Sequence, residues 1–247
     1  MSTPPVFLVD TVPAGEIAVL DGPEGHHAAT VRRLRGGEDL VLTDGRGALA
    51  RCEVLRAGKD HLELRVVRRA TQQEPRPRVV LAQALVKGER GELAVELATE
   101  AGVDEVLPWR AARCVARWDA GPRGTKALAR WRNTATASAK QARRSWHPEV
   151  REPVNTTALA GVIAAAARAL VLHESAAACL PEMTLPTGGD LVLVVGPEGG
   201  ITPEELAELA AAGATPVRLG RTVLRASTAA AVALGGIGMV TQRWSAG

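Results

Sequence analysis

The sequence predicts an α/β protein in two parts, a small β-barrel followed by a domain built on a parallel sheet. Short alternating strand patterns fill about the first 70 residues. Beyond them, apolar strand patterns alternate with helical ones, as in α/β domains with a parallel sheet. A polar stretch with two prolines, Thr71–Arg78, separates the two regions. We therefore expect one domain at residues 1–72 and a second at residues 77–247.

The first domain is expected to be all β. Its strand candidates alternate apolar and polar residues, and glycine and aspartate pairs such as Asp44-Gly45 separate them as turns. Short strands at this close spacing are typical of a small barrel. The candidates are Val6–Val9, Glu16–Leu20, Asp39–Thr43, Ala48–Leu55 and His61–Val67.

The second domain is expected to alternate strands and helices. Its strand candidates are short apolar runs, as expected where helices cover both faces of a parallel sheet. The expected strands are Val79–Val86, Val103–Pro108, Leu170–Leu172 and Leu191–Val195, and the expected helices are Arg90–Ala101, Lys126–Ala142 and Thr157–Arg168.

Composition bounds the class of protein. Of 247 residues, 46% are hydrophobic and 23% charged, which is typical of a globular chain. No apolar run reaches the roughly 20 residues of a membrane span, and no signal peptide is visible. Three scattered cysteines form no CxxC pair, so we expect a cytoplasmic protein without a disulfide framework or a zinc site.

The net charge of +3 does not by itself predict a nucleic-acid partner. Arginines cluster at residues 32–35, 65–69 and 143–144, and the guanidinium group grips phosphate well. A genome rich in G and C would raise the arginine, alanine and glycine content together, and it explains the arginine excess equally well.

The sharpest motif is Gly196-Pro197-Glu198-Gly199-Gly200, which follows the apolar strand Leu191–Val195. A helix start comes next, with Thr202 as N-cap, Pro203 in the first turn and Glu205 closing a capping box. A glycine-rich turn at the carboxyl end of a strand lets the backbone approach a ligand. The alternative is an ordinary tight turn.

Two further segments follow expected strands. In Val217–Ala229, a short strand is expected to end at Leu219, and Ser227 or Thr228 can cap the last helix. Arg225 stands just before that helix, where backbone N–H groups favour anions, although it can equally be a solvated surface residue. The dipeptide His173-Glu174 follows Leu170–Leu172, and alone it is typical of loop surface.

Several other patterns fail their structural tests. Gly45–Ala50 fits a loose dinucleotide-binding pattern, but a strand rather than a helix follows it. His26-His27 lacks a suitably spaced third ligand, so we expect no metal. Neither a Walker motif nor a Gly-x-Ser-x-Gly elbow occurs, which argues against ATP chemistry and against an α/β-hydrolase.

Taken in order, the three strand-end loops resemble the cofactor site of SPOUT-superfamily methyltransferases. The resemblance implies a deep trefoil knot and S-adenosylmethionine (SAM) wrapped by the loops, mainly through backbone contacts. The cofactor-binding residues it implies are His173, Glu174, Gly196, Pro197, Glu198, Gly199, Gly200, Leu219, Gly220, Leu224, Ser227, Thr228 and Ala229.

Nearly the whole chain resembles the 16S rRNA (uracil-N3)-methyltransferases, the ribosomal small-subunit methyltransferase E family, whose first domain is a PUA-like barrel. The matching motifs are His26-His27 with Val31, Arg33, Gly37 and Asp44-Gly45; Lys87–Arg90 and Ala98–Val103; Pro108, Arg113, Gln141, Arg144 and Pro148; Gly196–Gly200, Leu219-Gly220 and Leu224-Arg225. The chain departs from the family pattern at Ser227, usually Glu, at Ala101, usually Leu, and at Arg143, usually Gly.

The resemblance implies SAM-dependent methylation of N3 of a uridine in 16S rRNA, with S-adenosylhomocysteine as product. Arg225 is expected to stabilise the developing uracil anion, and Glu198 or His173 to act as the base. It also implies a homodimer that acts on 16S rRNA or the small ribosomal subunit. The residues expected to position RNA are Arg33, Arg113, Gln141 and Arg144.

Two readings of other kinds stay open at this point. One is a non-catalytic rRNA-binding assembly factor, with which the departure from the family pattern at Ser227 is compatible. The other is a SPOUT methyltransferase that acts on another RNA, such as a tRNA ribose. The chain has no tyrosine and one phenylalanine, so base stacking would fall to tryptophan, arginine or histidine.

Overall fold

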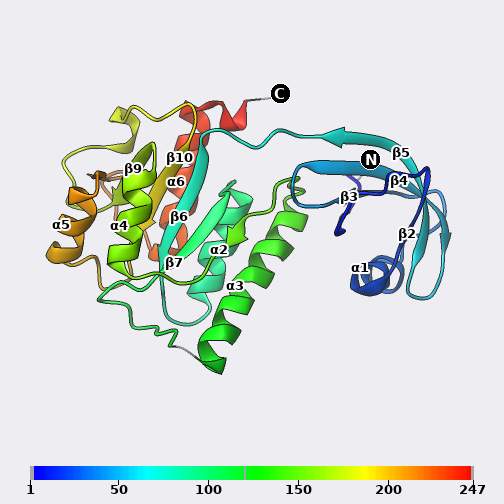
Figure 1. The fold of residues 1–247 in the computed structure, drawn as a ribbon, viewed down its shortest axis with the longest axis horizontal. Coiled ribbons are helices and arrows are strands. Elements are labelled where there is room, and N and C mark those ends of the chain that lie inside the picture. Colours follow the sequence, from blue (N-terminus) through cyan, green and yellow to red (C-terminus); the bar gives the residue numbers. More distant parts are fainter. Residues whose placement is uncertain (1–2, 120, 246–247) are drawn as a thin grey trace. The chain divides into compact units, whose positions relative to one another are not determined.

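The computed structural model describes residues 3–119 and 121–245, and these form two compact units (Figure 1). The first unit contains the chain up to Glu74 together with Ala139–His147. The second contains Pro75–Ser138 and the chain from Pro148 onward. The sequence patterns gave no reason to place Ala139–His147 with the first unit.

The first unit is built on a five-stranded sheet in the order β1-β3-β4-β5-β2. The pair β1·β3 is parallel and the other pairs are antiparallel. Alternate residues of β3 and β5, such as Leu40, Leu42 and Leu64, are buried in its core. All five expected strands are confirmed, as β1 (Val6–Leu8), β2 (Ile17–Leu20), β3 (Asp39–Thr43), β4 (Ala48–Ala57) and β5 (Leu62–Thr71).

Two short helical turns in the first unit were not expected from the sequence. These are α1 (Gly22–His26) and the π-helical turn His27–Val31. Five residues are too few to show a helical period, and α1 begins at a glycine and a proline, which by themselves indicate a turn.

The segment Ala139–His147 joins the first unit through backbone pairing. Gly47 N donates to Ser145 O at 2.9 Å, and His147 N donates to Gly45 O at 2.9 Å. Trp146 lies over Gly47, where a Cβ atom would come within 2.8 Å of the indole ring. Glycine at position 47 therefore lets Trp146 close the contact.

The second unit has a six-stranded, fully parallel sheet in the order β11-β9-β10-β6-β7-β8. All its strands therefore end at the same edge of the sheet. The strands are β6 (Arg78–Ala84), β7 (Glu105–Trp109), β8 (Glu149–Val150), β9 (Arg168–Leu172), β10 (Asp190–Val195) and β11 (Ala214–Val217), and the helices are α2 (Arg90–Glu100), α3 (Pro122–Gln141), α4 (Thr156–Ala165), α5 (Pro203–Ala211) and α6 (Ala226–Val240). Single 3-10 turns lie at Leu180–Glu182 and Gln242–Trp244.

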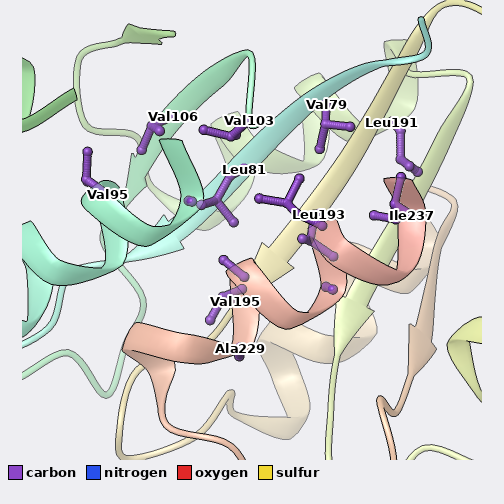
Figure 2. Packing of buried hydrophobic residues seen from close by; sticks show 14 of the residues in the cluster. Val79, Leu81, Val95, Val103, Val106, Leu191, Leu193, Val195, Ala229 and Ile237 are labelled. Atoms are coloured by element: carbon purple, nitrogen blue, oxygen red, sulfur yellow. The ribbon is translucent and has the colours of Figure 1, made fainter. Parts of the chain in front are cut away.

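Helices cover both faces of this sheet, which explains why its strands are apolar throughout. Leu191, Leu193 and Val195 of β10 point into the core shared with α2, α3 and α6 (Figure 2). Val192 and Val194 point to the other face, which α4 and α5 cover. The expected strand at Val79–Val86 ends earlier, at Ala84, and the last strand ends at Val217 rather than Leu219.

The C-terminal segment is anchored in the second unit by a buried ion pair. Arg243 Nη1 lies 2.7 Å from Asp104 Oδ2, and both side chains are about 5% exposed. The expected trefoil knot of this segment stays a prediction. Within the described ranges, no helix has both the length and the hydropathy needed to cross a bilayer.

Candidate active site

A cavity of ≈ 750 Å³ lies at the carboxyl edge of the parallel sheet. Its walls come mainly from the loops that follow β9, β10 and β11, the same three loops that the sequence singled out. Twelve of the thirteen residues expected to bind the cofactor line it, and the exception is Thr228. The lining members are His173, Glu174, Gly196, Pro197, Glu198, Gly199, Gly200, Leu219, Gly220, Leu224, Ser227 and Ala229.

The loop Gly196–Gly200 forms a tight turn between β10 and α5. Gly200 N donates to Pro197 O at 2.9 Å, and Gly200 has a φ of +74°, a conformation that glycine adopts readily. A Cβ at Gly196 would lie 2.7 Å from Ile201 Cγ1, closer than packed atoms allow. Glycines at these positions therefore allow the turn to close beside the cavity.

The expected capping box at the start of α5 is confirmed. Thr202 Oγ1 accepts from Glu205 N at 3.2 Å, and Glu205 Oε2 accepts from Thr202 N at 3.2 Å. The other carboxylate oxygen of Glu205 accepts from Ala112 N at 2.8 Å and from Thr156 Oγ1 at 3.0 Å. The buried Glu205 carboxylate therefore ties the glycine loop to the loop that follows β7.

The start of α6 corrects one expectation. The N-cap is Arg225, and neither Ser227 nor Thr228 caps the helix. Arg225 O accepts from Thr228 N at 3.0 Å, and the Thr228 hydroxyl also donates to this oxygen. The helix starts two residues earlier than a serine or threonine cap requires, so Ser227 is a buried residue of its first turn. Arg225 is exposed and lines the cavity.

The dipeptide His173-Glu174 belongs to the cavity wall as well. His173 N donates to Val217 O at 2.9 Å, which continues the pairing between β9 and β11. The His173 Nδ1 atom lies 2.9 Å from Ser175 Oγ, so Nε2 is the nitrogen left to face a ligand. The dipeptide, which by its sequence alone is typical of loop surface, is thus part of the site because it follows β9.

Two arginines hold the glycine loop from outside it. Arg90 Nη1 lies 3.8 Å from Glu198 Oε1, and Arg113 Nη1 donates to Gly199 O at 3.1 Å. Arg113, which was expected to position RNA, also lines this cavity, which we call the cofactor cavity because the sequence resemblance implies that it binds SAM. Two further arginines line the cavity without having been predicted as site residues. Arg90 lies in the motif Lys87–Arg90, and Arg218 directly follows β11.

The other residues expected to contact RNA belong to the first unit. Arg33 and Gln141 are exposed, and Arg144 is half-buried. Arg33 has a φ of +56°, a left-handed conformation that costs a side-chain-bearing residue about 1 kcal/mol or more. Such a cost at an exposed arginine marks it as a candidate for a functional contact.

The described residues contain no group of histidine, cysteine and acidic side chains able to hold a metal. His26, one of the pair weighed as a ligand, instead lies 2.7 Å from Asp60. Burial raises the pKa of the Cys52 thiol to about 11, and burial also raises the pKa of Cys114. These two cysteines are therefore thiols, not thiolate nucleophiles, at neutral pH.

Comparisons with known proteins agree on one family. An RNA methyltransferase domain matches residues 72–238, and an RNA methyltransferase PUA domain matches residues 20–67. The chain is 55% identical over 246 residues to the ribosomal RNA small subunit methyltransferase E of Mycobacterium bovis, covering 98% of this chain and 94% of that protein.

Solved structures of similar proteins contain SAM. A ribosomal RNA small subunit methyltransferase E from Neisseria gonorrhoeae, bound to SAM, is 25% identical with a TM-score of 0.85, covering 97% of this chain and 98% of that one. A Legionella pneumophila protein in complex with SAM is 28% identical with a TM-score of 0.83, covering 96% and 97%.

Proposed function

The chain belongs to the ribosomal RNA small subunit methyltransferase E family, and from this premise we propose that it methylates N3 of one uridine in 16S rRNA. That it is an RNA methyltransferase which takes its methyl group from SAM follows from the family and its SAM-bound members. The observation that carries the proposal is the cavity at the carboxyl edge of the sheet, where the three expected loops meet.

The cavity fits SAM in size and chemistry. Its volume lies within the roughly 300–1,000 Å³ typical of small-molecule sites. Leu172, Val195 and Leu224 offer apolar walls for an adenine ring, and Glu174 offers a carboxylate for a ribose hydroxyl or an ammonium group. A Cβ at Gly220 would meet nothing within 4 Å, so this loop leaves open space for a ligand.

When bound, SAM supplies an electrophilic methyl group and leaves as S-adenosylhomocysteine. The residues of the chain then have to deprotonate uracil N3 and stabilise the negative charge that develops on the ring. We assign charge stabilisation to Arg225. Glu198 is the proposed base because its carboxylate lines the cavity, with His173 Nε2 as the alternative.

We propose that residues 1–72 form the RNA-binding domain and residues 77–247 the catalytic domain. The match of a PUA domain to residues 20–67 supports the first assignment. Arg33, Gln141 and Arg144 are proposed to hold RNA from the first unit. Since the substrate is ribosomal RNA, the proposed compartment is the cytoplasm.

We also propose a homodimer that forms through the exposed side of the last helix, α6. The small residues of α6, such as Ala230 and Ala233, are buried in the core of their own chain. The exposed side of α6 carries Val232, Met239 and Val240, which are 50%, 80% and 62% exposed. Light scattering at micromolar concentration should give twice the chain mass, and a monomer would contradict the proposal.

The test of the function is a methyl-transfer assay with identification of the product. Purified protein and labelled SAM are incubated with small ribosomal subunits from a strain that lacks this gene, and the rRNA is digested to nucleosides. Labelled N3-methyluridine at one site is the expected result. Label on a ribose or on another base would contradict the proposed position. Absence of label, beside an active control enzyme, would contradict this substrate.

A further inference from the structure

A second cavity, also of ≈ 750 Å³, lies beside the cofactor cavity in the second unit. The two cavities share Val86, two residues beyond the end of β6. We call the second one the Trp118 cavity; the residues that matter for it are Arg117, Trp118, Arg123, Lys126 and Arg130, together with Val86. Apart from Val86, they come from the loop before α3 and from the first half of α3.

The Trp118 cavity carries a surplus of positive charge. Arg130 Nε lies 2.8 Å from Glu92 Oε1, so that pair is neutral as a whole. Arg117, Arg123 and Lys126 form no ion pair or hydrogen bond with any residue in the described ranges. Glu89 is the remaining carboxylate in the wall, so three unpaired cations face one anion. Such an excess favours an anionic ligand.

An aromatic surface lies next to these cations. Trp118 is half-buried, and its ring meets that of Trp131 edge-on, with centroids 4.8 Å apart and planes at 78°. Trp131 is 2% exposed and anchors this arrangement in the core. A tryptophan held in place by a buried neighbour offers a preformed surface for a planar base.

We propose that the Trp118 cavity binds a nucleotide of single-stranded RNA next to the methylated base, stacking its base on Trp118 and holding its phosphates with Arg117 and Lys126. The proposal rests on the function proposed above and adds a second nucleotide site to it. The shared wall at Val86 places this site beside the methyl donor. Cations and a stacking surface together are the usual features of single-strand recognition, whereas an acidic peptide would need the cations alone.

The experiment compares the double variant Arg117→Ala/Lys126→Ala with wild type. Fluorescence anisotropy measures binding of a short single-stranded oligouridine RNA at several salt concentrations. Loss of two phosphate contacts should weaken binding at least tenfold and lower the slope of log Kd against log salt by about 1.4, at about 0.7 for each phosphate. KM for small subunits should rise, while calorimetry should give an unchanged Kd for SAM.

Two further variants make the result specific. Trp118→Leu should weaken RNA binding, and Trp118→Phe, which keeps an aromatic face, should restore most of it. Arg132→Gln is the matched control, because it removes a charge from the same helix outside the cavity, where Arg132 pairs with Glu152 at 3.0 Å. RNA binding by the double variant within twofold of wild type, or an equal loss in Arg132→Gln, would overturn the proposal.

Failure of this proposal is distinct from failure of the proposed function. If wild type transfers methyl groups to small subunits and the cavity variants bind RNA normally, the Trp118 cavity has another ligand and the function stands. If wild type transfers no methyl group to these subunits, the proposed function fails whatever the RNA-binding data show.

Discussion

The cofactor cavity and the Trp118 cavity lie side by side but are built from different parts of the chain. The cofactor cavity lies among the loops that follow three neighbouring strands, and these loops contain the glycines Gly196, Gly199 and Gly220. The Trp118 cavity is lined largely by residues of α3 and of the loop before it, among them Trp118 and three cations that have no partner within the described ranges. A site at the ends of parallel strands depends on how strands and turns are ordered, whereas a charge surplus and a stacking surface depend on individual side chains.

This difference bears on Ser227, one of the positions at which we expect the chain to depart from the family pattern. Ser227 is buried in the first turn of α6, and the loop geometry around it comes from β11 and the helix start. By the same reasoning, each substitution in the Trp118 cavity should remove the contribution of one side chain to ligand binding. Substitutions at the glycines of the cofactor cavity should change ligand binding by changing the shape of a loop. The following predictions test this contrast, from the largest expected effect to the smallest.

Arg225→Ala is expected to have the largest effect, because Arg225 is the side chain to which we assign stabilisation of the charge that develops on the ring. Turnover should fall at least a hundredfold, as is typical when a charge-stabilising donor is removed. The Kd for SAM, measured by calorimetry, should stay within a few-fold of wild type. Turnover at the wild-type level would exclude a catalytic role for Arg225.

Glu205→Ala should destabilise the second unit by about 3 kcal/mol, because the buried carboxylate accepts from three donors that would lose their partner. Urea unfolding measures the change. Glu205→Gln keeps an acceptor oxygen and should lose less. Equal stability of Glu205→Ala and wild type would show that loop shape does not depend on this side chain.

Gly220→Ala should weaken SAM binding about tenfold without lowering stability. The added methyl group meets no protein atom within 4 Å and stands on a loop that lines the cavity, where we expect it to obstruct the bound ligand. Calorimetry gives the affinity, and thermal unfolding gives the stability. Gly161→Ala is the matched control, since its methyl group also meets nothing but lies in α4, away from the cavity. An unchanged Kd in Gly220→Ala would mean that SAM does not approach this loop.

Arg143→Gly should have the smallest effect, a gain in stability of at most about 1 kcal/mol. Arg143 has a φ of +56°, which glycine adopts without strain. Arg144→Gly, the neighbouring substitution, should lower stability instead. Denaturant unfolding of both variants checks the signs, and a loss of stability in Arg143→Gly would contradict the strain argument.

The cofactor cavity could be predicted from the sequence because its signals are local. A strand, a glycine turn and a capped helix start follow one another in Leu191–Glu205, and the parallel topology then brings the strand ends together. The two sheets were predicted for the same reason. The N-cap of α6 was missed because Arg225 caps it without a side-chain hydrogen bond, so no residue preference marks the position.

The remaining features depend on contacts between distant segments, which no local pattern shows. Arg117 and Lys126 face one cavity with Val86 only after the sheet has formed. The capping box predicted the contact of one carboxylate oxygen of Glu205. The partners of the other oxygen, Ala112 and Thr156, come from the loop after β7 and from the start of α4. Likewise, the strand-like pairing of Ser145–His147 with Gly45–Gly47 was invisible in either segment alone.

The most direct test of the contrast titrates both ligands into two variants, Gly220→Ala and Arg117→Ala/Lys126→Ala. Calorimetry with SAM and anisotropy with the single-stranded RNA give four dissociation constants to compare with wild type. The account predicts that Gly220→Ala weakens SAM binding alone and that the double variant weakens RNA binding alone. If either variant weakened the binding of both ligands equally, the two cavities would not divide the ligands between them, and the account would be wrong.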